Sequence, residues 1–512
     1  MPDLAALAGR VVCAGFPGNR IDDAVLAELR DLRPGALVLF GRNVSDRAGT
    51  RALVNAVRAA AGGDAPALVC VDQEGGRVAR LRFGAELPAM LALGAANDPA
   101  LAERSGAFIA SELRAVGANV AFAPVLDLAL EPRNAVIGTR SLGDDPARVG
   151  RLGAALVRGL QAGGVAATVK HFPGHGATHV DSHLALPELA QDGVTLRARD
   201  LAPFRAAFAG GARAVMSAHA VVRALDPARP ATLSRAVLTG LLRDELRFGG
   251  ACFTDCLRME AIARDFGTTR GAVLALDAGA DCVVVSADLA LAREVRDAIA
   301  AAVRAGTLAL ERLEEAAARV AALARAFPPA RERAAPFEDE ALPREIARRA
   351  IVVLRGDPVL DPARPVTVVS FEGHEGDGAS DAPGERPSLS LALRRRRLRS
   401  ELLRVAASPD DAMRDMLVDV LAAQGPRNVV IVMRRAHLRP AQRLAIEAIL
   451  TVAPGAVAVS ALEPFDAPVA ARARAVVATF GDDEPSVEAL ADVLAGREAA
   501  CGTLPVAASA LA

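Results

Sequence analysis

Residues 167–183 read ATVKHFPGHGATHVDSH, a strand-like run that passes into a polar, glycine-rich segment. The first six residues have the length and β-rich character of a buried strand. Pro173, Gly174 and Gly176 then make a continuing helix very unfavourable. The stretch therefore predicts a strand whose carboxyl end opens into a long loop.

The same strand-like pattern recurs along the first two-thirds of the chain. The eight runs lie at 11–16, 36–40, 67–72, 119–128, 167–172, 213–219, 250–255 and 281–286. Segments with helical periodicity separate them, and near-continuous apolar strands are typical of a parallel sheet covered on both faces. Eight strand–helix alternations predict an α/β fold with an N-terminal (β/α)8 TIM barrel. A doubly wound open sheet is the alternative.

A proline- and charge-rich segment follows this predicted barrel. It spans 328–343, and we interpret it as a linker between the barrel domain at 1–327 and a second domain at 344–512. The strand–helix alternation restarts after it, which predicts a C-terminal α/β sandwich around an open parallel sheet. The four arginines at 394–397 are interpreted as a solvated helix face.

The composition excludes several classes of function. Sixty basic and 61 acidic residues give a net charge of −1, so nothing favours nucleic acid or an anionic membrane as a partner. No apolar run is long enough for a membrane helix, and the N-terminus does not resemble a signal peptide. The six cysteines show no zinc spacing and are expected to be reduced. We therefore expect a cytoplasmic protein.

Polar residues repeatedly follow the predicted strands of the barrel. They are Asp72, Asp127, Lys170, His171, His219 and Asp255. Catalytic groups of TIM barrels gather where strands end, so these side chains are expected to meet at one mouth of the barrel. The alternative is a set of ordinary solvated loop starts.

Four histidines, at 171, 175, 179 and 183, follow one another at intervals of four residues. On a helix they would form one face and could hold a metal, but the proline and glycines predict a loop, so no metal site is expected. Asp181 lies two residues before His183, a spacing that lets the carboxylate orient the imidazole as a general acid/base. A merely loop-stabilising contact is the alternative. Asp255 is a candidate nucleophile or, alternatively, a helix N-cap.

Taken together, these segments resemble glycoside hydrolase family 3, and most closely its two-domain bacterial β-N-acetylglucosaminidase branch. The matching motifs are VDQEGGRVARL (71–81), APVLDL (123–128), IGTRSLGDDP (137–146), KHFPGHGATHVDSH (170–183), AVMSAHA (214–220), FTDCLRMEAI (253–262) and ADVLAGREAACGTLPV (491–506). The resemblance implies a flavodoxin-like second domain without the main catalytic groups.

The resemblance also implies a role for each matching residue. Asp255 corresponds to the nucleophile, His183 to the acid/base and Asp181 to its partner. Residues that bind the terminal sugar correspond to Asp72, Arg140, Lys170 and His171.

The implied activity is that of a retaining, exo-acting β-N-acetylglucosaminidase. It would hydrolyse terminal non-reducing β-linked GlcNAc through a covalent glycosyl-enzyme, in peptidoglycan or amino-sugar turnover, with no cofactor or metal. Because an imidazole acid/base does not repel an anion, a phosphorylase on the same site is one alternative. A β-glucosidase is another. Oligomeric state is left open.

Overall fold

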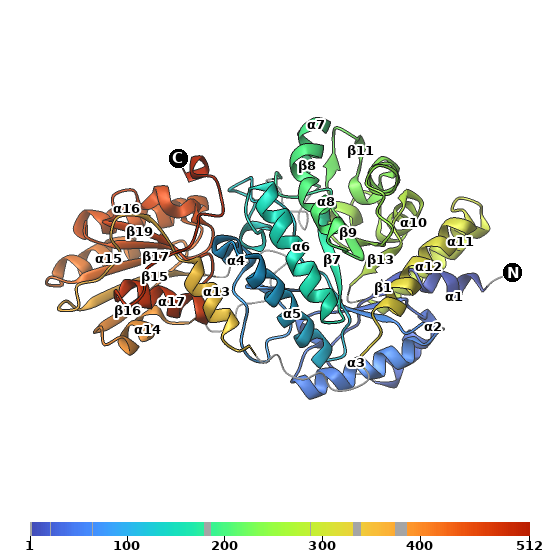
Figure 1. Ribbon diagram of the computed structural model, residues 1–512, viewed down its shortest axis with the longest axis horizontal. Helices are drawn as coiled ribbons and strands as arrows, with labels where there is room; N and C mark the ends of the chain where they lie inside the picture. Colours follow the sequence, from blue (N-terminus) through green and yellow to red (C-terminus); the bar gives the residue numbers. More distant parts are fainter. Residues whose placement is uncertain are drawn as a thin grey trace.

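The computed structural model describes residues 3–20, 22–63, 65–178, 186–286, 288–330, 339–373 and 387–511. A barrel and a separate six-stranded sheet lie side by side in it (Figure 1). Over these ranges, no helix combines the length and apolar character needed to cross a membrane.

The first unit is a closed barrel of eight parallel strands, one from each predicted run. In spatial order they are β1 (Val12–Ala14), β13 (Cys282–Val285), β12 (Ala251–Cys256), β9 (Ala214–Ser217), β7 (Ala166–Phe172), β6 (Val120–Ala121), β3 (Leu68–Val71) and β2 (Ala36–Leu39). The TIM barrel is thus confirmed, and the open-sheet alternative is wrong.

Amphipathic helices surround the barrel. The main ones are α2 (Asp23–Leu32), α3 (Arg47–Ala61), α5 (Pro99–Ala115), α6 (Pro146–Ala162), α8 (Ala202–Ala209), α10 (Thr268–Ala278) and α11 (Leu289–Arg304). Several of them begin at an aspartate whose side chain accepts a hydrogen bond from the first turn; these N-caps are Asp22, Asp46, Asp98, Asp145 and Asp288. The apolar faces of the helices pack on the outside of the strands.

Apolar side chains of mixed size fill the inside of the barrel, from Cys13 and Cys70 to the larger Phe253. Helix α12 (Leu310–Ala326) closes the end where the strands begin, because its Val320 and Leu323 join this interior cluster. The opposite end of the barrel, where the strands finish, is the end at which active sites of such barrels lie. All six cysteines are free thiols.

The second unit is a six-stranded sheet with the order β14 (Val352–Arg355), β19 (Ala475–Ala478), β18 (Val457–Ser460), β17 (Asn428–Met433), β15 (Val366–Glu372) and β16 (Ser400–Ala406). All pairs are parallel except β14 with β19. Without β14, the five strands follow the flavodoxin order 2-1-3-4-5. Its helices are α14 (Leu389–Arg395), α15 (Asp411–Ala423), α16 (Pro440–Val452) and α17 (Glu484–Leu494). The predicted α/β sandwich is confirmed.

Two details of this unit differ from the sequence analysis. Strand β16 was not predicted, because its alternation is weak and it follows a run of arginines that resembles a helix. The arginine run itself ends α14, and it is not simply solvated. Arg396 is largely buried and forms ion pairs with Glu488 and Asp492 of α17.

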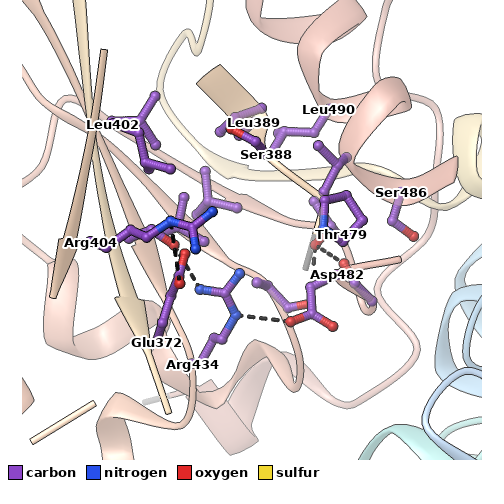
Figure 2. A pocket seen from close by; sticks show the side chains of 18 residues that line it. Glu372, Ser388, Leu389, Leu402, Arg404, Arg434, Thr479, Asp482, Ser486 and Leu490 are labelled. Carbon is purple, nitrogen blue, oxygen red and sulfur yellow. Dashed lines mark hydrogen bonds and ion pairs between the residues drawn. The ribbon is translucent and has the colours of Figure 1, made fainter. Parts of the chain in front are cut away.

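A small pocket lies at the carboxyl edge of the six-stranded sheet, as Figure 2 shows. Apolar residues such as Leu389 and Leu402 form part of its wall. Arg434 lies inside it and donates to Asp482 Oδ2 at 2.9 Å and to Ser370 Oγ at 3.0 Å. The charged groups here pair with one another.

The two units share an apolar core. Helix α13 (Leu342–Ala350) lies at the junction beside α4 (Met90–Ala96) (Figure 1), and Leu342 and Ile346 belong to the same buried cluster as the barrel helices. Near the end of the chain, Thr503 donates to Ala95 O at 2.9 Å. Part of the predicted linker, 331–338, lies outside the described residues, and the division at 328–343 stays a prediction.

Candidate active site

A cavity opens where the barrel strands end, with about 1230 Å³ of empty space that is partly open to solvent. Five of the predicted site residues line it: Asp72, Arg140, Lys170, His171 and Asp255. The other two, Asp181 and His183, lie outside the described residues. Of the polar residues that follow the predicted strands, Asp72, Lys170, His171 and Asp255 thus line one cavity, whereas Asp127 and His219 are not among its lining residues.

Lys170 and Arg140 are held by two carboxylates at the bottom of this cavity. Lys170 Nζ lies 2.7 Å from Asp72 Oδ1 and 2.6 Å from Glu74 Oε1. The Arg140 guanidinium binds both oxygens of Glu74 at 2.8 Å. We call Asp72, Glu74, Arg140 and Lys170 the charged network; a fixed, two-pronged geometry of this kind positions the remaining donors for a ligand.

Glu74 was missed as a site residue. It lies on the short strand β4 (Gln73–Gly75), which pairs with β5 (Val78–Ala79), and is 1% exposed. The sequence signal was available, because VDQEGG places a second carboxylate two residues after Asp72. A further signal is that Lys170 is the only lysine in the chain, beside many arginines. A compact ammonium fits between two buried carboxylates where a planar guanidinium would need more room.

Ionisation states in the charged network follow from its pairing. Burial alone would raise the pKa of Glu74, but Arg140 and Lys170 hold it well below its usual range. Burial would lower the pKa of Lys170, and the facing Asp72 and Glu74 reverse this and raise it. Glu74 and Lys170 are therefore both charged at neutral pH.

His171 is oriented by Asp127. His171 Nδ1 lies 2.6 Å from Asp127 Oδ2, and the same carboxylate accepts the backbone N–H groups of His171 and His175. Because a carboxylate only accepts, Nδ1 carries the proton and a neutral ring offers Nε2 as an acceptor. Nε2 lies 3.5 Å from Arg140 Nη2. Burial alone would raise the pKa of Asp127, but the adjacent His171 outweighs this effect, and the pKa is lowered.

His175 also lines the cavity, and burial lowers its pKa to about 4 against the opposing effect of Asp127. It is therefore neutral at pH 7. Within the described ranges, no three His, Cys, Asp or Glu side chains come together as metal ligands. His179 and His183, the other members of the four-residue series, lie outside those ranges.

Asp255 lies on β12 at the edge of the cavity, where its Oδ1 accepts the backbone N–H of Cys256 at 2.7 Å. The helix that follows, α9 (Glu260–Ala263), has Met259 at its N-cap position. The alternative in which Asp255 caps a helix is thus wrong. Nearby, His219 Nε2 lies 3.0 Å from Cys256 O, which ties the end of β9 to that of β12.

Comparison with known proteins agrees with this architecture. Residues 7–323 match the model of the glycosyl hydrolase family 3 N terminal domain. The chain belongs to glycosyl hydrolase family 3. This family 3 chain is accordingly a glycoside hydrolase.

Individual family 3 relatives cover one or both units. A beta-hexosaminidase of Pseudomonas aeruginosa is 45% identical over 274 residues, which is 52% of this chain and 80% of the relative. One from Stenotrophomonas maltophilia is 46% identical over 258 residues, or 49% of this chain and 75% of the relative. A solved family 3 β-N-acetylglucosaminidase of Paenibacillus covers 99% of both chains, with 36% identity and a TM-score of 0.92.

Proposed function

We propose that this family 3 glycoside hydrolase is a retaining, exo-acting β-N-acetylglucosaminidase that releases terminal non-reducing β-linked GlcNAc. The observation that carries the proposal is the shared cavity, in which Asp255 lines the same space as Asp72, Arg140 and Lys170 of the charged network. The names of the beta-hexosaminidases and of the β-N-acetylglucosaminidase similar to this chain support the choice of sugar.

In the proposed mechanism, Asp255 attacks the anomeric carbon while His183 protonates the leaving oxygen. The glycosidic bond breaks as the ester bond to Asp255 forms. His183 then removes a proton from water, which hydrolyses the ester and restores both residues. Two displacements retain the anomeric configuration. Asp181 is assigned as the partner of His183; the chemistry of these two residues rests on their motif.

Sugar binding is assigned to Asp72, Arg140, Lys170 and His171. Asp72 is 18% exposed at its side chain, so its carboxylate reaches the cavity while it also pairs with Lys170. It can accept from sugar hydroxyls, to which Lys170 and Arg140 can donate. His171 Nε2, held by Asp127 on the far side of the ring, supplies a further oriented group.

We place this activity in the turnover of cell-wall fragments or amino sugars in the cytoplasm. The barrel at 1–327 would hold the catalytic groups, and the second unit from 344 would carry none of them.

An assay on 4-nitrophenyl β-N-acetylglucosaminide, with and without phosphate, tests the proposal. Mass spectrometry identifies the sugar product. We expect free GlcNAc at the same rate in both conditions. GlcNAc 1-phosphate with a phosphate-stimulated rate would instead identify a phosphorylase. Cleavage of only the matched glucoside would overturn the choice of sugar.

A further inference from the structure

The segment 131–141, which we call the Arg140 loop, lies between the barrel and the second unit. Arginine side chains of the barrel donate hydrogen bonds to its backbone carbonyl groups. Arg77 Nη2 donates to Ala135 O at 2.7 Å and to Val136 O at 2.9 Å. Arg140 itself donates from Nη1 to Val136 O at 3.1 Å. The direction of the Arg140 side chain therefore depends on where this short stretch of backbone lies.

The second unit contacts the same stretch through Arg435. Arg435 Nη2 donates to Ala135 O at 3.1 Å and also to Glu463 Oε1 at 3.1 Å. Both side chains are buried, at 5% and 4% exposure. Burial would raise the pKa of Glu463, yet Arg435 and Arg77 lower it to about 2, so the pair is charged. A buried, doubly engaged arginine fixes its carbonyl partner more firmly than a surface contact does.

The backbone at Arg435 is shaped for this contact. Arg435 has φ 53°, a left-handed conformation that is uncommon for residues other than glycine. Arg434, just before it, points into the pocket of the second sheet and pairs with Asp482 (Figure 2). The next side chain turns to the barrel instead. Backbone outliers of this kind persist where the surrounding structure requires them.

On the barrel side, Gly138 makes room for the approaching pair. Its φ is +42°, and a Cβ at this position would lie 2.1 Å from Glu463 Oε1. A second contact lies close by, because His437 Nε2 donates to Pro132 O at 3.0 Å. His437 Nδ1 lies 2.7 Å from Asp466 Oδ1. Two side chains from the loop after β17 thus contact the Arg140 loop.

The Arg140 loop also reaches the loop after β7. Asn134 Nδ2 donates to His175 O at 2.9 Å, and Asn134 Oδ1 accepts from Ile137 N at 3.1 Å. Displacement of the Arg140 loop would therefore be passed on to His175 as well as to Arg140.

We propose that Arg435 is a positioning residue for sugar binding, through which the second unit holds the Arg140 loop and sets the direction of Arg140. The inference rests on the sugar-binding role proposed for Arg140. Arg435 does not touch the substrate; it acts on Ala135 O, and a shift of this backbone by about 1 Å misaligns a binding group enough to cost up to about a hundredfold in rate.

A double-mutant cycle between Arg435 and Arg140 tests the proposal in the full chain. Arg435→Ala is expected to raise KM and to lower kcat/KM by about tenfold or more. In an Arg140→Ala background the same change should alter kcat/KM less than about twofold, because the group it positions is gone. Added guanidinium ions should partly restore the kcat/KM of Arg435→Ala and leave the kcat/KM of the double variant unchanged.

Arg349→Ala is the matched control. Arg349 lies on α13 and joins the two units through an ion pair with Asp98 at 3.0 Å, away from the Arg140 loop. Its kcat/KM is expected to stay near that of the unmodified chain. Should Arg435→Ala not fold, Arg435→Lys takes its place in the cycle. It keeps the buried charge beside Glu463, but its side chain is one bond shorter and is expected to fall short of Ala135 O.

Independent, multiplicative losses from the two changes would overturn the positioning role while leaving that of Arg140 intact. Unaltered activity of Arg435→Ala would also overturn it. Unaltered activity of Arg140→Ala would overturn the sugar-binding role of Arg140 itself, and the inference with it. The hydrolysis assay on the unmodified chain tests the choice of sugar independently. A wrong sugar is therefore distinguished from a wrong role of Arg435 and from a wrong role of Arg140.

Discussion

Glu74 is the centre of the charged network. It is almost fully buried, and it binds Arg140 through both oxygens and Lys170 through one. A buried ion pair adds little net stability, but loss of one partner leaves the others as uncompensated buried charges. The cost of a change at this residue is therefore larger than the cost of an ordinary surface ion pair.

Glu74→Gln removes that negative charge with little change in shape. We expect it to lower the free energy of unfolding by about 3 kcal/mol or more, and kcat/KM with it, because Arg140 then loses its paired carboxylate and Lys170 keeps only Asp72. Urea unfolding measures the first effect. The control is Glu103→Gln, whose pair with Arg158 is about half exposed on both sides and should cost less than about 1 kcal/mol. Equal losses in the two variants would contradict this account.

His175 makes stability depend on pH. Burial lowers its pKa in the folded chain to about 4 from an ordinary value of 6.5, so the unfolded chain binds the proton more readily. The resulting stability is fully present above pH 6.5 and is lost as pH falls towards 4. We expect the free energy of unfolding to fall by about 3 kcal/mol across this window from this residue. His175→Gln should remove that part of the slope in urea titrations, and an unchanged slope would refute it.

At the scale of elements, the barrel strands other than β1 supply residues at or near their carboxyl ends to the cavity. β7 ends in Lys170, His171 and Phe172, and Asp255 comes near the end of β12. These side chains meet because parallel strands of a closed barrel finish at one mouth. The loop after β7 continues into the motif that carries Asp181 and His183.

Asp255→Asn is expected to abolish trapping of a glycosyl-enzyme by a mechanism-based fluorinated glycoside. Turnover should fall by at least about a thousandfold, because the amide cannot form the ester. Mass spectrometry of peptic peptides locates the label on 251–256 in the unmodified chain. Asp265→Asn, at an exposed aspartate paired with Arg264, should label normally. A label on any other carboxylate would reassign the nucleophile.

At the scale of the whole molecule, the two units are joined by a continuous core. Ile346 on α13 is 2% exposed and belongs to the same cluster as the barrel helices. Arg435 and His437 add polar contacts across the same junction. Because apolar burial is shared, loss of packing at the junction should affect both units at once.

Ile346→Asp tests this coupling. A charge buried at the junction is expected to lower the free energy of unfolding by about 3 kcal/mol or more. Hydrogen exchange should rise in peptides from β3 and β17 together. Leu444→Asp, at an exposed leucine of α16, should change stability by less than about 0.5 kcal/mol. Faster exchange in one unit alone would show that the two unfold independently.

The sequence by itself determined the strand count of the barrel and the side chains at its mouth. Local periodicity marks each buried strand, and barrel geometry then requires that polar residues after Val71, Val169 and Thr254 converge. The same reasoning predicts four of the five parallel strands of the second sheet. It misses β16, because the half-exposed residues of this strand lack a clear alternation.

Only the tertiary structure decided which charges pair. Glu74 with Arg140 spans 66 positions and Arg435 with Ala135 spans 300, so no local pattern indicates either contact. Likewise, the sequence alone does not show that Asp255 caps no helix, because this depends on where α9 begins. Strands form from short-range alternation and burial, whereas the pairing of charged side chains depends on which strands and loops the closed barrel and the docked second sheet bring within hydrogen-bonding distance.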